Sequence, residues 1–207
     1  MIKSNRYFIF FTSIMLIVYV IQVLSPLRLN NDSSIFLMMA DNYLTRGDFK
    51  YNGNVVSYPI GYPLVIVLLN WIGIATPFFF VLINVIFLFG GVYLFANFIE
   101  KELNFDTKTV QLLVAATLLN FLSVKYTLLP QSDIIFFGLS FFVLYLVHIQ
   151  ASSVAWRVAL LTSAALFCYI AIQVRTFGIV LLPVLVLSFI RLFYPTNIAF
   201  IFINTKS

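Results

Sequence analysis

NNDSSIFLMMADNYLTRGDFKYNGNVVSYPIGYPL, residues 30–64, is the longest polar interval in a chain that is otherwise mostly apolar. It follows an apolar run, residues 7–24, that is long enough to cross a bilayer. The interval also carries three of the seven acidic residues, Asp32, Asp41 and Asp48. We therefore interpret the rest of the chain as a scaffold that holds this loop, and a few charged residues facing it, at one membrane surface.

The composition of the 207 residues sets the class of protein. Hydrophobic residues make up 62% of the chain and charged residues 9%, and the mean hydropathy is +1.05. A soluble domain of this length cannot bury that much apolar surface, so lipid must solvate part of it. The apolar runs are continuous rather than alternating, which favours a multi-pass bundle of transmembrane helices over a β-barrel. The net charge of +5 does not imply a nucleic-acid partner.

Residue types that hold metals or cofactors are scarce in this chain. Cys168 is the single cysteine, so no intrachain disulfide can form. His148 is the single histidine and closes an apolar run, where we interpret it as the solvated end of a span. No phosphate-binding loop, dinucleotide fingerprint or nucleophile elbow occurs. The sequence indicates no cofactor and leaves a divalent metal open.

The polar interval itself contains a predicted helix. Asp32, followed by Ser33 and Ser34, is a typical helix start, and Gly47 is a typical end. Apolar residues recur at helical spacing between them, and polar residues fall on another side. The apolar set is Phe36, Met39, Ala40, Tyr43 and Leu44, and the polar set is Asp41, Thr45 and Arg46. This pattern predicts an amphipathic helix that lies in the membrane interface.

We interpret five later apolar runs as spans: residues 77–98, 110–124, 134–150, 158–173 and 177–190. The segment 58–75 is ambiguous because its apolar core is short and is interrupted by Asn70 and Gly73. We expect a transmembrane domain over residues 1–191, with a first outer loop at 26–76, and a tail over 192–207 that makes no further span.

The number of basic residues on each side of the membrane indicates whether the segment 58–75 crosses it. If it does not cross, seven basic residues are cytoplasmic: Lys3, Arg6, Lys101, Lys108, Arg157, Arg191 and Lys206. Five are then outside: Arg28, Arg46, Lys50, Lys125 and Arg175. If it does cross, the count becomes four inside and eight outside, which violates the positive-inside rule. We therefore predict six spans, a cytoplasmic N-terminus and a re-entrant or interfacial helix at 58–75. Asp32, Asp133 and Arg175 then share the outer face.

Each candidate residue also has a structural interpretation. Asp32 and Asp133 are each either a helix N-cap or a functional carboxylate. Arg175 either reaches the interface along its aliphatic stem or holds an anion such as phosphate. Tyr58 and Tyr62 are either interfacial aromatics or part of a substrate site.

The loop carries a recognisable motif. Asp32, Phe36, Ala40, Asn42, Leu44 and Gly47 follow the pattern D-x(3)-[YF]-x(3)-A-x-N-x-L-x(2)-G, and YPIGYPL comes after it. This arrangement resembles the GT-C superfamily of polyprenyl-phosphate-dependent membrane glycosyltransferases, in particular the bacterial branch related to protein O-mannosyltransferases and lipid A aminoarabinose transferases. Asn84, Ser132 followed by Asp133, and the turn around Arg175 extend the resemblance over most of residues 7–190.

The resemblance implies a function. A sugar would pass, with inversion, from a polyprenyl-phosphate donor to an unidentified glycan, lipid or protein acceptor at the outer face of the plasma membrane. Asp32 matches the family's general base, and Asp133, Arg175, Tyr58 and Tyr62 would contact the substrate. The chain departs from the family in carrying Ser33 where many relatives have a second acidic residue, and Asp133 where glutamate is common. Relatives are usually longer, which implies an N-terminal portion or a truncated member.

Two alternatives stay open from the sequence. One is a catalytically inactive membrane protein that binds a lipid-linked sugar, which the lone acidic residue of the loop motif favours. The other is a small transporter. The spans carry no ionisable residue near their middle, and the two halves show no paired broken helices, both of which speak against transport.

Overall fold

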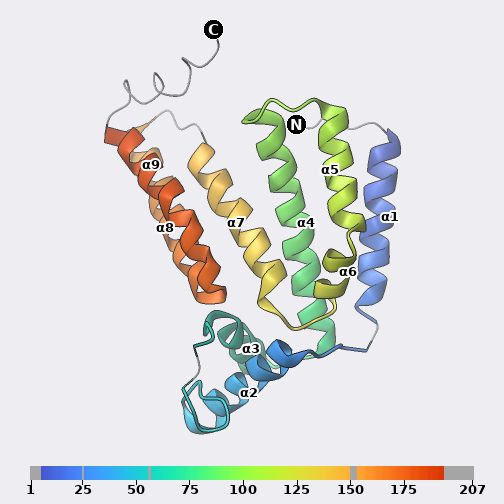
Figure 1. Cartoon of the computed structure of the whole chain (residues 1–207), viewed down its shortest axis with the longest axis vertical. Coiled ribbons are helices and arrows are strands. Elements are labelled where there is room, and N and C mark those ends of the chain that lie inside the picture. Colours follow the sequence, from blue (N-terminus) through green and yellow to red (C-terminus); the bar gives the residue numbers. More distant parts are fainter. Residues whose placement is uncertain (1–5, 25, 56, 150–152, 194–207) are drawn as a thin grey trace.

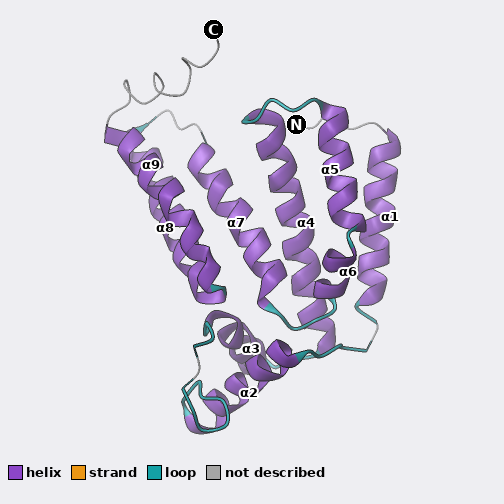
Figure 2. Cartoon of the chain, in the orientation of Figure 1, coloured by secondary structure: helices purple, strands orange, loops and turns teal. Residues whose placement is uncertain are grey.

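The computed structural model describes residues 6–24, 26–55, 57–149 and 153–193. In these ranges all regular structure is helical, apart from an isolated antiparallel bridge between Tyr51 and Asn54 (Figure 2). The elements in chain order are α1 (Arg6–Gln22), α2 (Asn31–Arg46), α3 (Gly61–Trp71), α4 (Pro77–Lys101), α5 (Thr107–Leu119), α6 (Phe121–Thr127), α7 (Ser132–His148), α8 (Val154–Val174), the 3₁₀ helix η1 (Thr176–Leu181) and α9 (Leu182–Phe193).

The long helices form an up-and-down bundle. In Figure 1, α1 runs down, α4 up, α5 and α6 down, α7 up, α8 down and α9 up. The centre of the bundle is α7, which packs against both α4 and α8. Helices α2 and α3 pack on each other at the lower end, below the start of α7 and the end of α8 (Figure 1). Short connections between antiparallel neighbours are typical of helical bundles.

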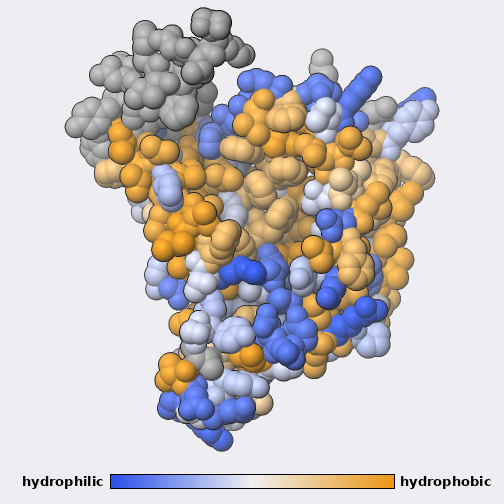
Figure 3. All heavy atoms as spheres, viewed as in Figure 1, coloured by the Kyte–Doolittle hydropathy of each residue, from blue (hydrophilic) through white to orange (hydrophobic). Residues whose placement is uncertain are grey.

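Helix length and apolar surface indicate a membrane protein. Helices α4 (25 residues) and α8 (21 residues) are long and apolar enough to cross a bilayer, and α5 with α6 would be a third span, bent by 51°. Many large apolar side chains are exposed on α1, among them Phe10, Ile17 and Ile21. In Figure 3 apolar residues cover the flanks of the bundle, and hydrophilic residues gather at its two ends. Lipid is the solvent that such a surface requires.

Helices α1 and α7, which correspond to the predicted spans 7–24 and 134–150, are short for spanning helices. Helices α1 and α7 have 17 residues each, which is the lower limit for a spanning helix. Helix α3 has 11 residues, so it extends only about 16 Å, roughly half of the hydrocarbon thickness of a bilayer. The predicted tail at 192–207 lies, beyond Phe193, outside the described residues.

Small residues allow the central helices to approach closely. A Cβ on Gly91 of α4 would lie 3.0 Å from the Cα of Gly138 on α7, and a Cβ on Gly138 would lie 2.7 Å from the carbonyl oxygen of Phe87. Glycine is therefore required on both sides of this crossing. The α4–α7 contact fixes the position of the first turn of α7, which carries Asp133.

The predicted span at 110–124 is broken at Asn120, where α5 ends and α6 begins. The Asn120 side chain caps α6 by accepting from Leu122 N at 2.8 Å. Asn84, fully buried on α4, donates through Nδ2 to the carbonyl oxygens of Thr127 (3.1 Å) and Leu129 (2.8 Å). These bonds satisfy carbonyl groups at the end of α6 and just after it, and they hold the connection into α7 against α4.

Candidate functional site

Two helix N-termini meet at the lower end of the bundle. Asn30 is the N-cap residue of α2 and Gln131 is the N-cap residue of α7. Asn30 Nδ2 donates to Gln131 Oε1 at 3.0 Å, which joins the two caps. Asp32 and Asp133 are each the second residue of the helix that follows. The cap-to-cap hydrogen bond therefore ties together the two helix ends that carry the candidate carboxylates.

The interpretation of Asp32 as a helix N-cap is wrong, because Asn30 occupies that position. Asn30 Oδ1 accepts from Ser33 N at 2.8 Å and from Ser33 Oγ at 2.7 Å. The cap interpretation of Asp133 is also wrong, because Gln131 holds the N-cap position of α7 and Asp133 lies inside the helix. The Gln131 side chain makes no capping hydrogen bond. Both carboxylates lie in a first helical turn, where the free N–H groups and the helix dipole stabilise negative charge.

Tyr58 lies against Asp32. Its hydroxyl donates to Asp32 Oδ1 at 3.3 Å, and its ring packs edge-on against Phe36 of α2. The negative charge of Asp32 raises the pKa of Tyr58 above its ordinary value, with smaller contributions from burial and from the hydrogen bond itself. Tyr58 therefore keeps its proton and acts as a donor that orients the Asp32 carboxylate. The Tyr58 side chain is exposed, so the pair is open to solvent.

Asp133, at the start of α7, pairs with Arg175, at the end of the neighbouring helix α8. Arg175 Nη1 contacts Asp133 Oδ1, and the side chains are 42% and 22% exposed respectively. The second carboxylate oxygen, Asp133 Oδ2, is buried and has no hydrogen-bond partner among the described residues. The guanidinium carries five N–H donors, and its half-exposed part is accessible to a further anion.

The turn after α8 fixes Arg175. Arg175 is the C-cap residue of α8 in an extended conformation, and Gly178 N donates to its carbonyl oxygen at 2.8 Å. A Cβ on Gly178 would lie 2.7 Å from the backbone nitrogen of Ile172. The chain therefore folds back directly against α8, and Arg175 is held at the lower end of the bundle.

The segment YPIGYPL connects α2 and α3 to this turn. A Cβ on Gly61 would lie 2.5 Å from the carbonyl oxygen of Gln173 and 2.6 Å from the nitrogen of Val174. Tyr62 is 1% exposed and packs against Phe36, and burial raises its pKa. The structure thus brings Tyr58 to Asp32 but encloses Tyr62 in the core, where it packs α3 against α2 instead of facing a substrate.

Gly61→Ala is expected to destabilise the lower end of the bundle by about 2–3 kcal/mol, because backbone atoms of α8 must move to admit the methyl group. Gly90→Ala is the matched control, since a Cβ there meets nothing within 4 Å. The midpoint of thermal unfolding in detergent measures both. Equal midpoints for the two variants would contradict the close approach of α3 to α8.

Asn30→Ala is expected to lower the free energy of unfolding by about 1–2 kcal/mol, since it removes both the α2 cap and the bond to Gln131. Asn31→Ala is the control, because Asn31 is an exposed neighbour on the same turn. Thermal unfolding again provides the measurement. A loss in Asn31→Ala as large as that in Asn30→Ala would show that the cap has no special role.

The role of Asn30 and Gln131 as joined N-cap residues was not predicted from the sequence. A signal was present in the sequence: an amide side chain lies two residues before each aspartate, in Asn30-Asn31-Asp32 and in Gln131-Ser132-Asp133.

Within the ranges that the structure describes, no group of three or more His, Cys, Asp or Glu residues is placed to hold a metal ion.

Comparison of the chain with protein-family models, with curated proteins and with solved structures found no match.

Proposed function

We propose that this chain is a GT-C-like membrane glycosyltransferase that transfers a sugar from a polyprenyl-phosphate donor to an acceptor at the extracytoplasmic face. The observation that carries the proposal is the hydrogen bond between Asn30 and Gln131. It joins the helix end that carries Asp32 to the helix end where Asp133 pairs with Arg175. A base and an anion-binding cation at neighbouring helix ends are the two groups that this transfer requires.

The chemistry is a single displacement. Asp32 accepts the proton of the acceptor hydroxyl as the acceptor oxygen attacks the anomeric carbon of the sugar. The bond from that carbon to the phosphate oxygen breaks, its electron pair stays on the phosphate, and the configuration inverts. Arg175 stabilises the negative charge that develops on the leaving phosphate. Asp133 holds Arg175 and contributes negative charge near a transition state of oxocarbenium character.

Six spans and an extracytoplasmic lower end belong to this proposal. The spans are α1, α4, α5 with α6, α7, α8, and η1 with α9, and α2 and α3 lie at the outer surface. The alternating direction of these segments supports the assignment (Figure 1), as does the excess of basic residues predicted for the cytoplasmic side. A plasma-membrane location is also part of this proposal.

A binding protein without turnover is the second candidate, and one observation favours it. Ser33 stands where many relatives of the resembled family carry a second acidic residue, and here its side chain is fully buried and bonded to Asn30. An acidic residue at position 33 would place a buried negative charge against Asn30 Oδ1. The loop therefore accommodates the Asp32 carboxylate but not a second one beside it.

The experiment uses the purified full chain in liposomes with a panel of radiolabelled polyprenyl-phosphate sugars and a membrane extract as the source of acceptor. Label that moves from the lipid fraction to an acceptor supports the glycosyltransferase. Saturable donor binding without release of polyprenyl phosphate supports the binding protein. Neither binding nor transfer for any donor in the panel would overturn both.

A further inference from the structure

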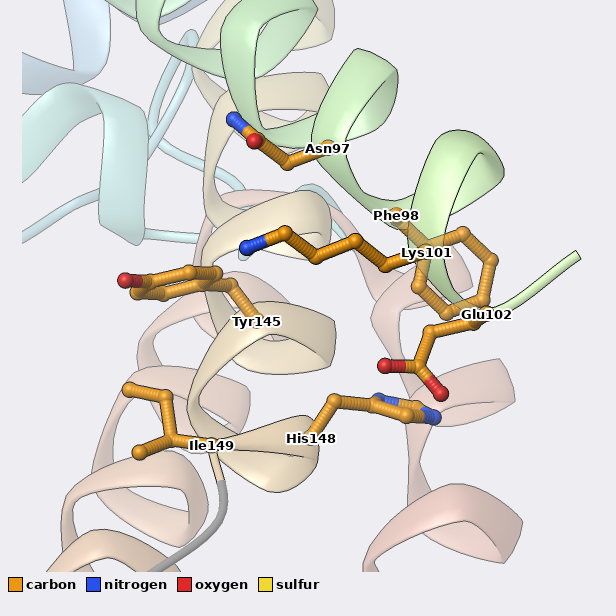
Figure 4. A pocket seen from close by; sticks show the side chains of 7 residues that line it. All are labelled: Asn97, Phe98, Lys101, Glu102, Tyr145, His148 and Ile149. Atoms are coloured by element: carbon orange, nitrogen blue, oxygen red, sulfur yellow. The ribbon is translucent and has the colours of Figure 1, made fainter. Parts of the chain in front are cut away.

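A second polar site lies at the upper end of the bundle, far from Asp32 and Asp133. A cavity of about 420 Å³ opens between the last turns of α4 and α7 (Figure 4). It is lined by Asn97, Phe98, Lys101, Glu102, Tyr145, His148 and Ile149. Asp133 and His148 lie at opposite ends of α7, about 22 Å apart along the helix. The candidate active site therefore does not account for this cavity.

Two opposite charges face the cavity without neutralising each other. In Figure 4 the Lys101 ammonium extends toward the Tyr145 ring, and the Glu102 carboxylate lies beside the His148 imidazole. Within the part of the chain that the structure describes, neither Lys101 nor Glu102 forms an ion pair. A site with one separated positive and one separated negative group is complementary to a ligand that carries both charges.

The neutral groups of the cavity have defined hydrogen-bonding roles. Asn97 is 6% exposed and donates through Nδ2 to the carbonyl oxygen of Tyr93 at 2.9 Å, so its Oδ1 is left as an acceptor. His148 Nδ1 lies 2.8 Å from the carbonyl oxygen of Leu144. Because a carbonyl only accepts, Nδ1 carries the proton, and Nε2 is the nitrogen available to a ligand.

The position of the cavity suggests the source of the ligand. Helix α4 is a candidate span of 25 residues that ends at Lys101, so it extends about 37 Å and its last turn reaches the headgroup layer of a bilayer. Molecules with a phosphate and an ammonium group are concentrated in that layer as phospholipid headgroups. The exposed Tyr145 has the amphipathic character typical of this depth.

We propose that this cavity binds the headgroup of an ethanolamine-type phospholipid, with its phosphate at Lys101 and Tyr145 and its ammonium at Glu102. Lys101 and the Tyr145 hydroxyl supply donors for phosphate oxygens, and the Glu102 carboxylate accepts from the ammonium N–H groups. A quaternary ammonium has no N–H to donate, so the site discriminates ethanolamine from choline headgroups. The proposal is independent of the glycosyltransferase function.

The test measures lipid affinity of the purified full chain by native mass spectrometry, with phosphatidylethanolamine, phosphatidylcholine and phosphatidylglycerol added separately. Phosphatidylethanolamine is expected to bind most tightly. Glu102→Gln is expected to weaken its binding about tenfold and to leave phosphatidylglycerol unchanged, and Lys101→Gln to weaken both lipids. Lys108→Gln, an exposed lysine at the same end outside the cavity, is the matched control and is expected to bind like the parent chain.

Equal affinity for the three lipids, or unchanged selectivity in Glu102→Gln, would overturn the proposal. Lys101→Arg keeps the charge and is expected to restore phosphatidylglycerol binding, which separates loss of the phosphate contact from misfolding. Soluble phosphoethanolamine is the competitor. If it displaces the lipid at micromolar concentration, the ligand is a free phosphate ester of the same chemistry, and if it does not, the ligand is the membrane lipid.

Discussion

Asp32→Asn is expected to lower sugar transfer from a polyprenyl-phosphate donor by a factor of roughly 10²–10⁴, the contribution that a positioned general base makes. The substitution keeps the size of the side chain and its ability to accept from the Tyr58 hydroxyl, but the amide cannot take up the proton of the acceptor. The measurement is initial rate of transfer in liposomes, at equal amounts of folded protein.

Asp41→Asn is the matched control for this variant. Asp41 is an exposed carboxylate on the same helix, so its substitution changes the net charge equally without touching the site. Its rate is expected to equal that of the parent chain. A parent-like rate in Asp32→Asn, or an equal loss in both variants, would remove Asp32 from the role of base.

Arg175→Gln is expected to have the second largest effect on the rate of sugar transfer. Loss of the guanidinium removes charge stabilisation at the leaving phosphate, for which single electrostatic contacts contribute about 10²–10³ in rate. It also leaves the partly buried Asp133 without its cation, which costs about 1–3 kcal/mol of stability. Transfer rate and thermal unfolding are measured on the same preparation.

A double variant separates the two effects of Arg175. Asp133→Asn in the Arg175→Gln background removes the unpaired charge, so the midpoint of unfolding is expected to recover toward that of the parent chain. Transfer is expected to stay low, because the phosphate contact is still missing. Recovery of transfer together with stability would show that Arg175 serves the fold alone.

The helix of the polar loop follows closely from local sequence signals. The pattern between Asp32 and Gly47 predicts a helix, and α2 covers residues Asn31–Arg46 with Phe36, Met39 and Ala40 buried. Gly47 ends it in the left-handed conformation, with φ of 79°, which glycine adopts at little cost. Propensity, spacing and capping all favour the same element here.

Tertiary contacts decide the details that local signals leave open. Asn30 and Asp32 are both good capping residues, and the choice of Asn30 is coupled to its bond with Gln131, a residue 101 positions away. The break at Asn120 accompanies the bonds from the buried Asn84 to carbonyl oxygens at the end of α6 and just after it. No window of sequence contains both partners of either contact, so neither could be predicted from the local pattern.

In the candidate site, too, the sequence indicates the charged residues, but tertiary packing determines their contacts. Asp32, Asp133 and Arg175 stand out in the sequence as charged residues at the edges of apolar runs. The pairing of Asp133 with Arg175 depends on the packing of α7 against α8. Tyr58 and Tyr62 look equivalent in YPIGYPL. Tyr58, however, precedes α3 and its side chain is exposed to solvent, whereas Tyr62 lies in the first turn of α3 and its side chain is buried in the core.

The proposed topology places the N-terminal ends of α2 and α7 and the Arg175 turn together on the outer side of the membrane. It is tested by labelling single cysteines in intact cells with a membrane-impermeant maleimide, in a Cys168→Ser background. Asn31→Cys and Lys125→Cys, exposed positions at the lower end, and Lys108→Cys, exposed at the upper end, are the variants. We expect labelling at positions 31 and 125 and none at 108 until the cells are opened. Labelling of position 31 from one side and position 125 from the other would contradict it.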